Sequence, residues 1–240
     1  MSELTQVSRR RFLQLTGLAS GGVMLGASLE VRARENALID MPAGLADQPL
    51  SMNLFVQIAA DDQVYIVAHR SEMGQGSRTG LPQIVADELE ADWAKVTVVQ
   101  GMANNAFGSQ NTDGSRSVRD FYNKMREMGA TARSMLEQAA AAKWQVPVAE
   151  CQARDHRVHH SASKRSLGFG ELAEAAAKVP MPKSESLRYK SDDAFKYIGK
   201  PVPVVDLHDF VTGDTTYGLD VDLPDMVYAS IQRCPILGGE

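Results

Sequence analysis

Cysteine is nearly absent from this chain, which has only Cys151 and Cys234 among 240 residues. Zinc ribbons and similar metal sites need paired ligands at short spacing, and neither cysteine has such a neighbour. An iron–sulfur cluster held by four thiolates is excluded because the chain has too few cysteines. We expect two unpaired, structurally neutral thiols, with a disulfide in an oxidising compartment as the alternative.

Basic runs are also missing beyond the first residues, and the formal net charge is -5. Binding to duplex nucleic acid depends on clustered Lys and Arg that neutralise phosphates, so we exclude a nucleic-acid partner. The G-x-S-x-G signature of a hydrolase nucleophile is absent too. Hydrophobic residues make up 44% of the sequence, a normal globular fraction that allows a core in one large domain or two small ones.

The first 33 residues have the features of an export signal. Residues 8–14, S-R-R-R-F-L-Q, contain adjacent arginines followed by an apolar pair, which is the twin-arginine signature. A modest apolar run without charge follows, as in a secretory signal. We therefore predict export by the twin-arginine pathway to the periplasm, with the segment either cleaved or kept as a membrane anchor. A surface helix that begins with arginines is the alternative.

Strand and helix patterns alternate after a linker over residues 34–50. Residues 53–59 and 63–69 are apolar, β-rich and separated by a short acidic turn, which predicts a hairpin. Apolar spacing and strand propensity predict the remaining elements: a helix over 81–91, a strand over 95–100, a loop over 101–116, a long helix over 117–144, a strand or hairpin over 149–169 and a short helix over 170–178.

The last segment changes character after a polar linker over residues 180–196. Residues 197–240 are rich in Gly and Pro, and about forty residues are few for an independent core. We expect them to begin a second, β-rich module of a longer chain, with strands at 202–205, 215–219 and 227–232. The predicted division is therefore 1–33, 34–50, 51–179, 180–196 and 197–240.

A loop with two glycines lies between the predicted hairpin and the helix that follows it. At its centre stand Gly74, Gln75 and Gly76. Glycine lets the backbone approach a ligand closely, and the start of the next helix offers unpaired N–H groups to an anion. The Gln75 amide can serve a ligand as donor and acceptor. A tight turn without a ligand is the alternative, and Gly80 lies one residue too far for a dinucleotide fingerprint.

A second loop of this kind precedes the long helix. Gly114 would admit a phosphate to the helix start, Ser115 and Ser117 are candidate N-caps, and Arg116 is a fork-shaped anion binder. An ordinary capped loop is the alternative. Two such loops, each at a helix start, would together suit the two ends of one pyrophosphate-containing ligand.

Three histidines occur in the stretch H-R-V-H-H at residues 156–160. In a strand, His156 and His160 would share one face and His159 the other. Because no acidic or cysteine ligand is in obvious reach and arginines lie between the histidines, we favour a solvated hairpin over a metal site and assign no metal ligand.

At these two loops the sequence resembles the xanthine dehydrogenase/aldehyde oxidase family of molybdenum hydroxylases, and most of all the large (beta) subunits of the isoquinoline 1-oxidoreductase type. The similar stretches cover nearly all of the chain after residue 50: E-M-G-Q-G at 72–76, L-P-Q-I-V-A-D-E-L at 81–89, G-S-R-S at 114–117, I-G-K-P-V-P at 198–203, V-T-G at 211–213 and Y-G-L-D at 217–220.

The resemblance implies an α+β fold, in which a molybdopterin-binding α/β region is followed by the beginning of an α/β-hammerhead domain. It implies molybdopterin cytosine dinucleotide as the cofactor, with Gly74, Gln75 and Gly76 approaching it and residues 114–117 near its phosphates. The implied reaction is hydroxylation of an aldehyde or N-heteroaromatic carbon with oxygen from water. Electrons would leave through an iron–sulfur small subunit, with a membrane cytochrome c as a candidate acceptor.

One departure from the family bears on catalysis. The family's catalytic glutamate lies in a glycine-rich motif near the end of the full subunit, and no stretch here is similar to it. Glu72 is not given that role, and no catalytic residue is assigned. We therefore expect residues 1–240 alone to show no hydroxylase turnover. An exported binding or assembly module without catalysis is the rival hypothesis.

Overall fold

The computed structural model describes residues 50–238, which form an α+β fold divided into two compact units after Val202. The fold class agrees with the prediction from the sequence. The predicted export segment and nearly all of the linker after it lie outside the described residues. None of the helices in the described part is both long enough and apolar enough to span a bilayer.

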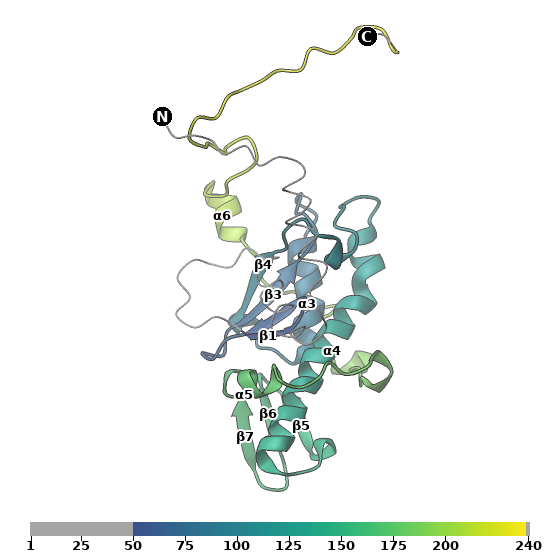
Figure 1. Ribbon diagram of the computed structural model, residues 1–240, viewed down its shortest axis with the longest axis vertical. Helices are drawn as coiled ribbons and strands as arrows, with labels where there is room; N and C mark the ends of the chain where they lie inside the picture. The colour runs from purple at the N-terminus through teal and green to yellow at the C-terminus, as the bar shows by residue number, and fades with distance from the viewer. Residues whose placement is uncertain (1–49, 239–240) are drawn as a thin grey trace, which may run out of the picture. The chain divides into compact units, whose positions relative to one another are not determined.

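The first unit is built on a four-stranded sheet in the order β1-β2-β3-β4 (Figure 1). The strands β1 (Leu50–Asn53), β2 (Val56–Ile58) and β3 (Val64–Ala68) are antiparallel neighbours, and β4 (Val96–Gln100) pairs with β3 in parallel. A parallel pair needs a crossover connection, which α3 (Ser77–Leu89) supplies. The carboxyl ends of the parallel pair therefore meet at one edge of the sheet. Two loops begin there, which we call the glycine loops: one contains Gly74 and Gly76, and the other contains Gly114.

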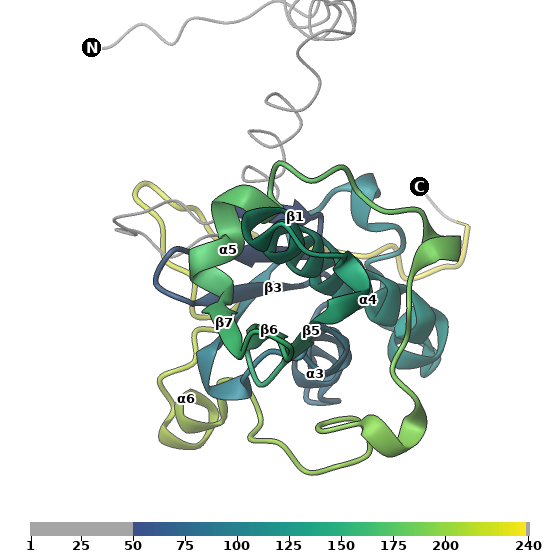
Figure 2. The same ribbon diagram turned by 90° about the horizontal axis from the view of Figure 1, so that it is seen from below.

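The longest element is α4 (Arg116–Trp144), which connects this sheet with a smaller one. One part of it packs against α3, and another part packs against α5 (Phe169–Ala176) and a three-stranded antiparallel sheet. Figure 2 shows α5 and this small sheet grouped around α4. The small sheet consists of β5 (Cys151–Arg154), β6 (Arg157–His160) and β7 (Arg165–Gly168).

Most predicted elements are present in the first unit, although their ends are shifted. The helix expected over 81–91 begins four residues earlier, at Ser77, so Pro82 lies in its second turn instead of its first. It ends earlier because Glu90 adopts a left-handed backbone. The region 149–169 forms three strands instead of one hairpin, because the chain reverses twice.

The second unit, described for residues 203–238, contains one short helix, α6 (Leu207–Thr212), and no strand. Its large apolar side chains are exposed, among them Leu219 and Val227. Residues with high strand propensity form strands only where another strand pairs with them and one face is buried, and the described unit provides neither. The predicted strands are therefore wrong for these residues: 202–205, 215–219 and 227–232. The hammerhead assignment and the domain boundaries stay predictions.

Buried charges attach residues 188–198 to the two packed helices. Asp87 is fully buried and accepts hydrogen bonds from Lys190 Nζ at 2.6 Å and from the backbone N–H groups of Tyr197 and Ile198, each at 2.8 Å. Burial alone would raise the pKa of Asp87, but these donors hold it below its usual value. The acids in the A-D-E-L stretch of α3 are thus part of the packing.

Glu88 is the second fully buried acid of this stretch, and it pairs with two arginines of α4. Arg126 lies 2.6 Å from its carboxylate and Arg133 lies 3.4 Å from it. The side chain of Arg133 also donates to the backbone carbonyl oxygens of Glu88 and Arg188. The cluster therefore ties α3, α4 and residues 188–198 together.

Gly129 marks the closest approach of the two helices, and Gly129→Ala is expected to lower the free energy of unfolding by about 1–3 kcal/mol. A methyl group there would lie 2.5 Å from the carbonyl oxygen of Val85 and 2.7 Å from Cβ of Glu88. The clash must outweigh the gain in helix propensity, which is about 1 kcal/mol. Urea titration of both variant and wild type measures the difference.

Gly80→Ala, in α3, is the matched control for this prediction. A methyl group at Gly80 would meet only Val118, at an ordinary contact distance of 3.8 Å. Without a clash, the same substitution is expected to stabilise the protein by about 0.5–1 kcal/mol. A stabilising effect in both variants would show that the helix spacing tolerates the methyl group.

Candidate functional site

The two glycine loops contact each other at the carboxyl ends of β3 and β4. Thr112 Oγ1 donates to the backbone oxygen of Ser71 at 2.9 Å, and Gln110 Nε2 donates to that of His69 at 3.0 Å. A cavity of about 410 Å³ lies between the loops. Five of the seven residues predicted to bind a cofactor line it: Gln75, Gly76, Gly114, Ser115 and Ser117. Gly74 and Arg116 are not among the lining residues.

The backbone N–H groups of the first loop are already occupied by a side chain. Oε1 of Glu72 accepts from the N–H groups of Gly74 at 2.7 Å and Gly76 at 2.9 Å, and more weakly from that of Met73 at 3.2 Å. Oε2 accepts from the N–H of Arg78, in the first turn of α3, at 3.0 Å. The expectation of unpaired N–H groups at this helix start is therefore wrong, because a carboxylate from the same loop binds them.

The pKa of Glu72 reflects this environment. Burial favours the neutral acid and raises the pKa, but the backbone donors stabilise the carboxylate and bring the pKa below its usual value. Glu72 is therefore ionised at neutral pH and supplies the negative charge that the positive end of α3 attracts.

The amide of Gln75 is also folded back onto its own loop. Its Oε1 accepts from the N–H of Met73 at 2.6 Å, and its Nε2 donates to Ser77 Oγ at 2.5 Å and to the oxygen of Ser71 at 3.0 Å. Both ends of the amide thus have partners within residues 71–77. Gln75 lines the cavity while its polar atoms hold the loop together.

The start of α4 differs from that of α3, because no side chain caps it. Ser115 occupies the N-cap position, but its backbone is left-handed, with φ of 55°, and its hydroxyl makes no capping bond. An N-cap normally has an extended backbone, from which the side chain reaches the first turn, so the capping prediction for Ser115 is wrong. Ser117 lies within the first turn and is therefore not an N-cap either; it is 8% exposed, and its hydroxyl makes no hydrogen bond among the described residues.

Arg116 is not directed to the cavity but paired within its own loop. Its guanidinium donates to Asp113 through Nε at 3.0 Å and Nη2 at 2.7 Å, and this pair is exposed. The pKa of Arg116 is raised by the hydrogen bond and charge of Asp113. Of the predicted anion binders in this loop, the structure therefore brings Gly114, Ser115 and Ser117 to the cavity.

Two residues behind the loops were not predicted from the sequence. Arg70 is 1% exposed, and its guanidinium donates to the carbonyl oxygens of Ser109, at 2.8 Å, and Asn111. It lies over the ring of Phe121 at 5.2 Å, and no carboxylate pairs with it among the described residues. A buried, uncompensated cation therefore supports the second loop. A basic residue directly after a buried strand was the only signal in the sequence.

The neighbouring His69 is equally buried, and neither of its ring nitrogens has a hydrogen-bond partner in the described chain. The rings of Phe55 and Phe121 lie 5.3 and 4.4 Å from the imidazole. Burial and the charge of Arg70 lower the pKa of His69 to about 4. The imidazole is therefore neutral at neutral pH.

The histidine stretch at 156–160 is not solvated as predicted, because two of its histidines are buried. His156 is 3% exposed, with Nε2 at 2.9 Å from the oxygen of Asp62 and Nδ1 accepting from the N–H of Asp92 at 3.1 Å. His160 lies 2.8 Å from Glu150. No cluster that could hold a metal ion occurs among residues 50–238, and both cysteines are free.

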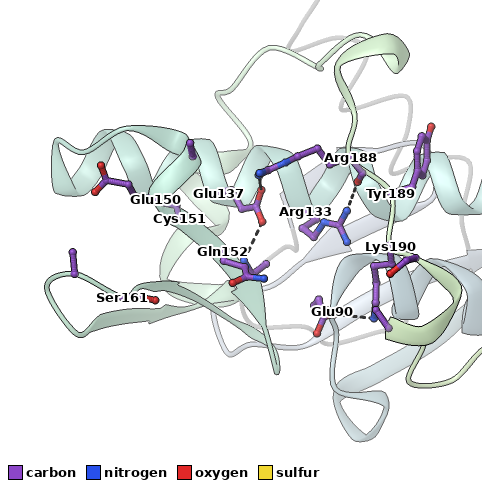
Figure 3. Close-up of a pocket in the computed structure, with 15 residues that line it drawn as sticks. Glu90, Arg133, Glu137, Glu150, Cys151, Gln152, Ser161, Arg188, Tyr189 and Lys190 are labelled. Carbon is purple, nitrogen blue, oxygen red and sulfur yellow. Dashed lines mark hydrogen bonds and ion pairs between the residues drawn. The ribbon is translucent and has the colours of Figure 1, made fainter.

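A larger cavity, of about 770 Å³, lies between α4, β5 and residues 188–194 (Figure 3). Its charged side chains are paired with one another or with neighbours. Glu137 lies 3.1 Å from Arg188 and accepts from the N–H of Ala153, and Lys190 lies 2.7 Å from Glu90. Burial raises the pKa of the Cys151 thiol in its wall. These contacts account for its charges without a ligand, so the smaller cavity is the candidate site.

Comparison with known proteins finds similarity over most of the chain. Residues 33–213 match the family model described as the molybdopterin cofactor-binding domain. The chain is 32% identical over 275 residues to isoquinoline 1-oxidoreductase subunit beta of Brevundimonas diminuta, in an alignment that covers 98% of this chain and 34% of that protein.

Two further similarities are weaker. The chain is 28% identical over 246 residues to the membrane-bound aldehyde dehydrogenase (pyrroloquinoline-quinone) of Gluconacetobacter polyoxogenes, covering 97% of this chain and 30% of that one. Quinoline 2-oxidoreductase from Pseudomonas putida 86 matches with a TM-score of 0.40 and 21% identity, over 54% of this chain and 17% of that one. The chain spans about a third of the length of the curated relatives it matches.

Proposed function

Because this chain belongs to the molybdopterin cofactor-binding family of the molybdenum hydroxylases, we propose that the cavity between its two loops binds a molybdopterin cofactor in its cytosine dinucleotide form. The observation that carries the proposal is the uncapped start of α4 at this cavity, together with the hydroxyl of Ser117 in its first turn, which makes no hydrogen bond among the described residues. Uncapped N–H groups and a free hydroxyl are donors that suit a phosphate.

The residues at the cavity fit such a group in two further respects. Gly76 and Gly114 have positive φ values, 83° and 49°, which let the backbone itself form the wall. The buried charge of Arg70 supports the second loop and makes this region favourable for an anion. Gly76, Gly114 and Ser117 would hold the cofactor, which would supply the redox chemistry, while the chain supplies position and electrostatics.

For the complete subunit we propose hydroxylation of an aldehyde or an N-heteroaromatic compound with oxygen from water. The relatives support these substrate classes by their names, which refer to isoquinoline and to aldehyde. An iron–sulfur small subunit would carry electrons away; the name of one relative, a beta subunit, supports a further subunit, and residues 1–240 have too few cysteines for such a cluster. The twin arginines at residues 9–10 support export to the periplasm, with a membrane cytochrome c as a candidate electron acceptor.

Molybdenum content tests the proposal directly. The full 240-residue chain, purified from the cytoplasm of a host that makes the cytosine dinucleotide cofactor, is expected to contain molybdenum and to release CMP on acid hydrolysis. Ser117→Ala should weaken retention of molybdenum through gel filtration by about ten- to a hundredfold, since a hydrogen bond to a charged group contributes about 1.5–3 kcal/mol.

Ser134→Ala is the matched control, because it makes the same change further along α4, away from the cavity. It should retain molybdenum as the wild type does. Equal retention by the Ser117→Ala and Ser134→Ala proteins would remove Ser117 from the site. A folded wild-type chain without molybdenum or pterin would favour the rival interpretation, an exported binding or assembly module.

A further inference from the structure

The carboxylate of Glu72 takes the place that a bound anion occupies at a helix start. Four backbone N–H groups converge on its two oxygens, from Met73, Gly74, Gly76 and Arg78. Convergent N–H groups of this kind form the concave anion sites of phosphate-binding loops. Here the anion is covalently part of the loop, so the loop keeps its shape without help from a ligand.

The other helix start at the same cavity has no such internal anion. No side chain caps α4, and its first turn contains the unpartnered Ser117 hydroxyl. The two helix starts therefore differ in charge balance, although both follow parallel strands at the same edge of the sheet. A second anion placed at the start of α3 would meet the negative charge of Glu72, whereas one at α4 would meet uncapped N–H groups, with the nearby carboxylate of Asp113 already paired with Arg116.

We infer that Glu72 is a positioning residue that acts as a built-in anion, fixing the backbone of Gly74 to Gly76 in the shape that lines the cavity and leaving the start of α4 to the anionic part of the cofactor. The inference rests on the proposed function. Glu72 touches neither substrate nor reacting atoms in this role, because both of its oxygens are engaged by the backbone of its own loop and by α3.

Hydrogen exchange of the cofactor-free protein tests the first half of this inference. The full chain is produced in a host that cannot make molybdopterin, and amide exchange is followed for residues 73–78. Glu72→Gln keeps the size of the side chain but removes its charge and turns one acceptor into a donor that faces the N–H of Arg78. Exchange in this segment should accelerate by about tenfold, which corresponds to about 1.4 kcal/mol.

Glu171→Gln is the matched control, since Glu171 accepts from the N–H of Gly168 at the start of α5 and does not line the cavity. It should leave exchange at residues 73–78 unchanged. In a Glu72→Ala protein, added formate should restore part of the protection, because it supplies the missing carboxylate. A merely structural loss of stability would not be reversed by formate in this one segment.

The second half of the inference, that the loop shaped by Glu72 serves cofactor binding, is tested by the molybdenum content of protein made in a host that produces the cofactor. Glu72→Gln should retain about tenfold less molybdenum than the Glu171→Gln and wild-type proteins. Unchanged exchange at residues 73–78 would overturn the inference, as would unchanged or increased molybdenum retention, since an increase would mean that Glu72 competes with the cofactor. If the wild type acquires no molybdenum, the proposed function fails, whereas the exchange comparison still decides whether Glu72 fixes the loop.

Discussion

Glu88→Ala is expected to lower the free energy of unfolding by about 3–5 kcal/mol, the cost of leaving buried charges without their partner. The carboxylate is fully buried, and the side chains of Arg126 and Arg133 that pair with it are only 16% and 11% exposed. Removing it leaves two guanidinium groups without a counter-charge between α3 and α4. Guanidinium chloride titration, followed by circular dichroism, measures the change.

Glu174→Ala provides the comparison for Glu88. Glu174 also forms an ion pair, with Lys178 at 2.6 Å, but both side chains are mostly exposed. Exposed pairs contribute little, so this variant should unfold at the same denaturant concentration as the wild type. Similar behaviour of the two variants would show that burial does not govern the strength of the Glu88 cluster.

The stability of the protein is expected to decrease in mild acid because of His69. The unfolded chain binds a proton on this imidazole below pH 6.5, whereas the folded protein binds it only below about pH 4. The free energy of unfolding should therefore be retained above pH 6.5 and fall by about 3 kcal/mol as the pH is lowered to about 4. Denaturant titrations at a series of pH values measure this slope.

His69→Phe isolates the contribution of His69 to the pH dependence of the free energy of unfolding. The variant keeps an aromatic ring beside Phe55 and Phe121 but cannot bind a proton. In this variant, the free energy of unfolding should fall much less between pH 6.5 and 4 than in the wild type. His156, whose pKa is lowered mainly by burial, will still contribute in the same direction. His159→Gln, at a partly exposed position, should keep the wild-type slope; a His69→Phe slope as steep as the wild type would contradict the prediction.

The sequence predicted the elements of the first unit because their patterns are local. Apolar spacing over 117–144 agrees with α4, and the β-branched run at 95–100 agrees with β4. The two loops could be placed at helix starts for the same reason. The predicted strands beyond residue 202 failed because strand formation depends on a pairing partner, which a local pattern does not specify.

The hydrogen bonding of the site could not be read from the sequence in the same way. That Gln75 would bond to its own loop, and that Glu72 would occupy the start of α3, depends on side-chain directions set by the left-handed backbone at Gly74 and Gly76. The support from Arg70 joins residues about forty positions apart, which no spacing rule connects. The residue types of the loop were informative, but their partners were not.

The continuity of α4 has a mechanical consequence for the cavity. The helix has 29 residues, so it extends for about 43 Å without a break, from the cavity wall to the small sheet. A stiff rod transmits tilt from one end to the other. A substitution that weakens the packing of α5 on the far end of α4 would therefore tilt the whole helix. The first turn, which contains Ser117, would move at the cavity even though no residue near it had been changed.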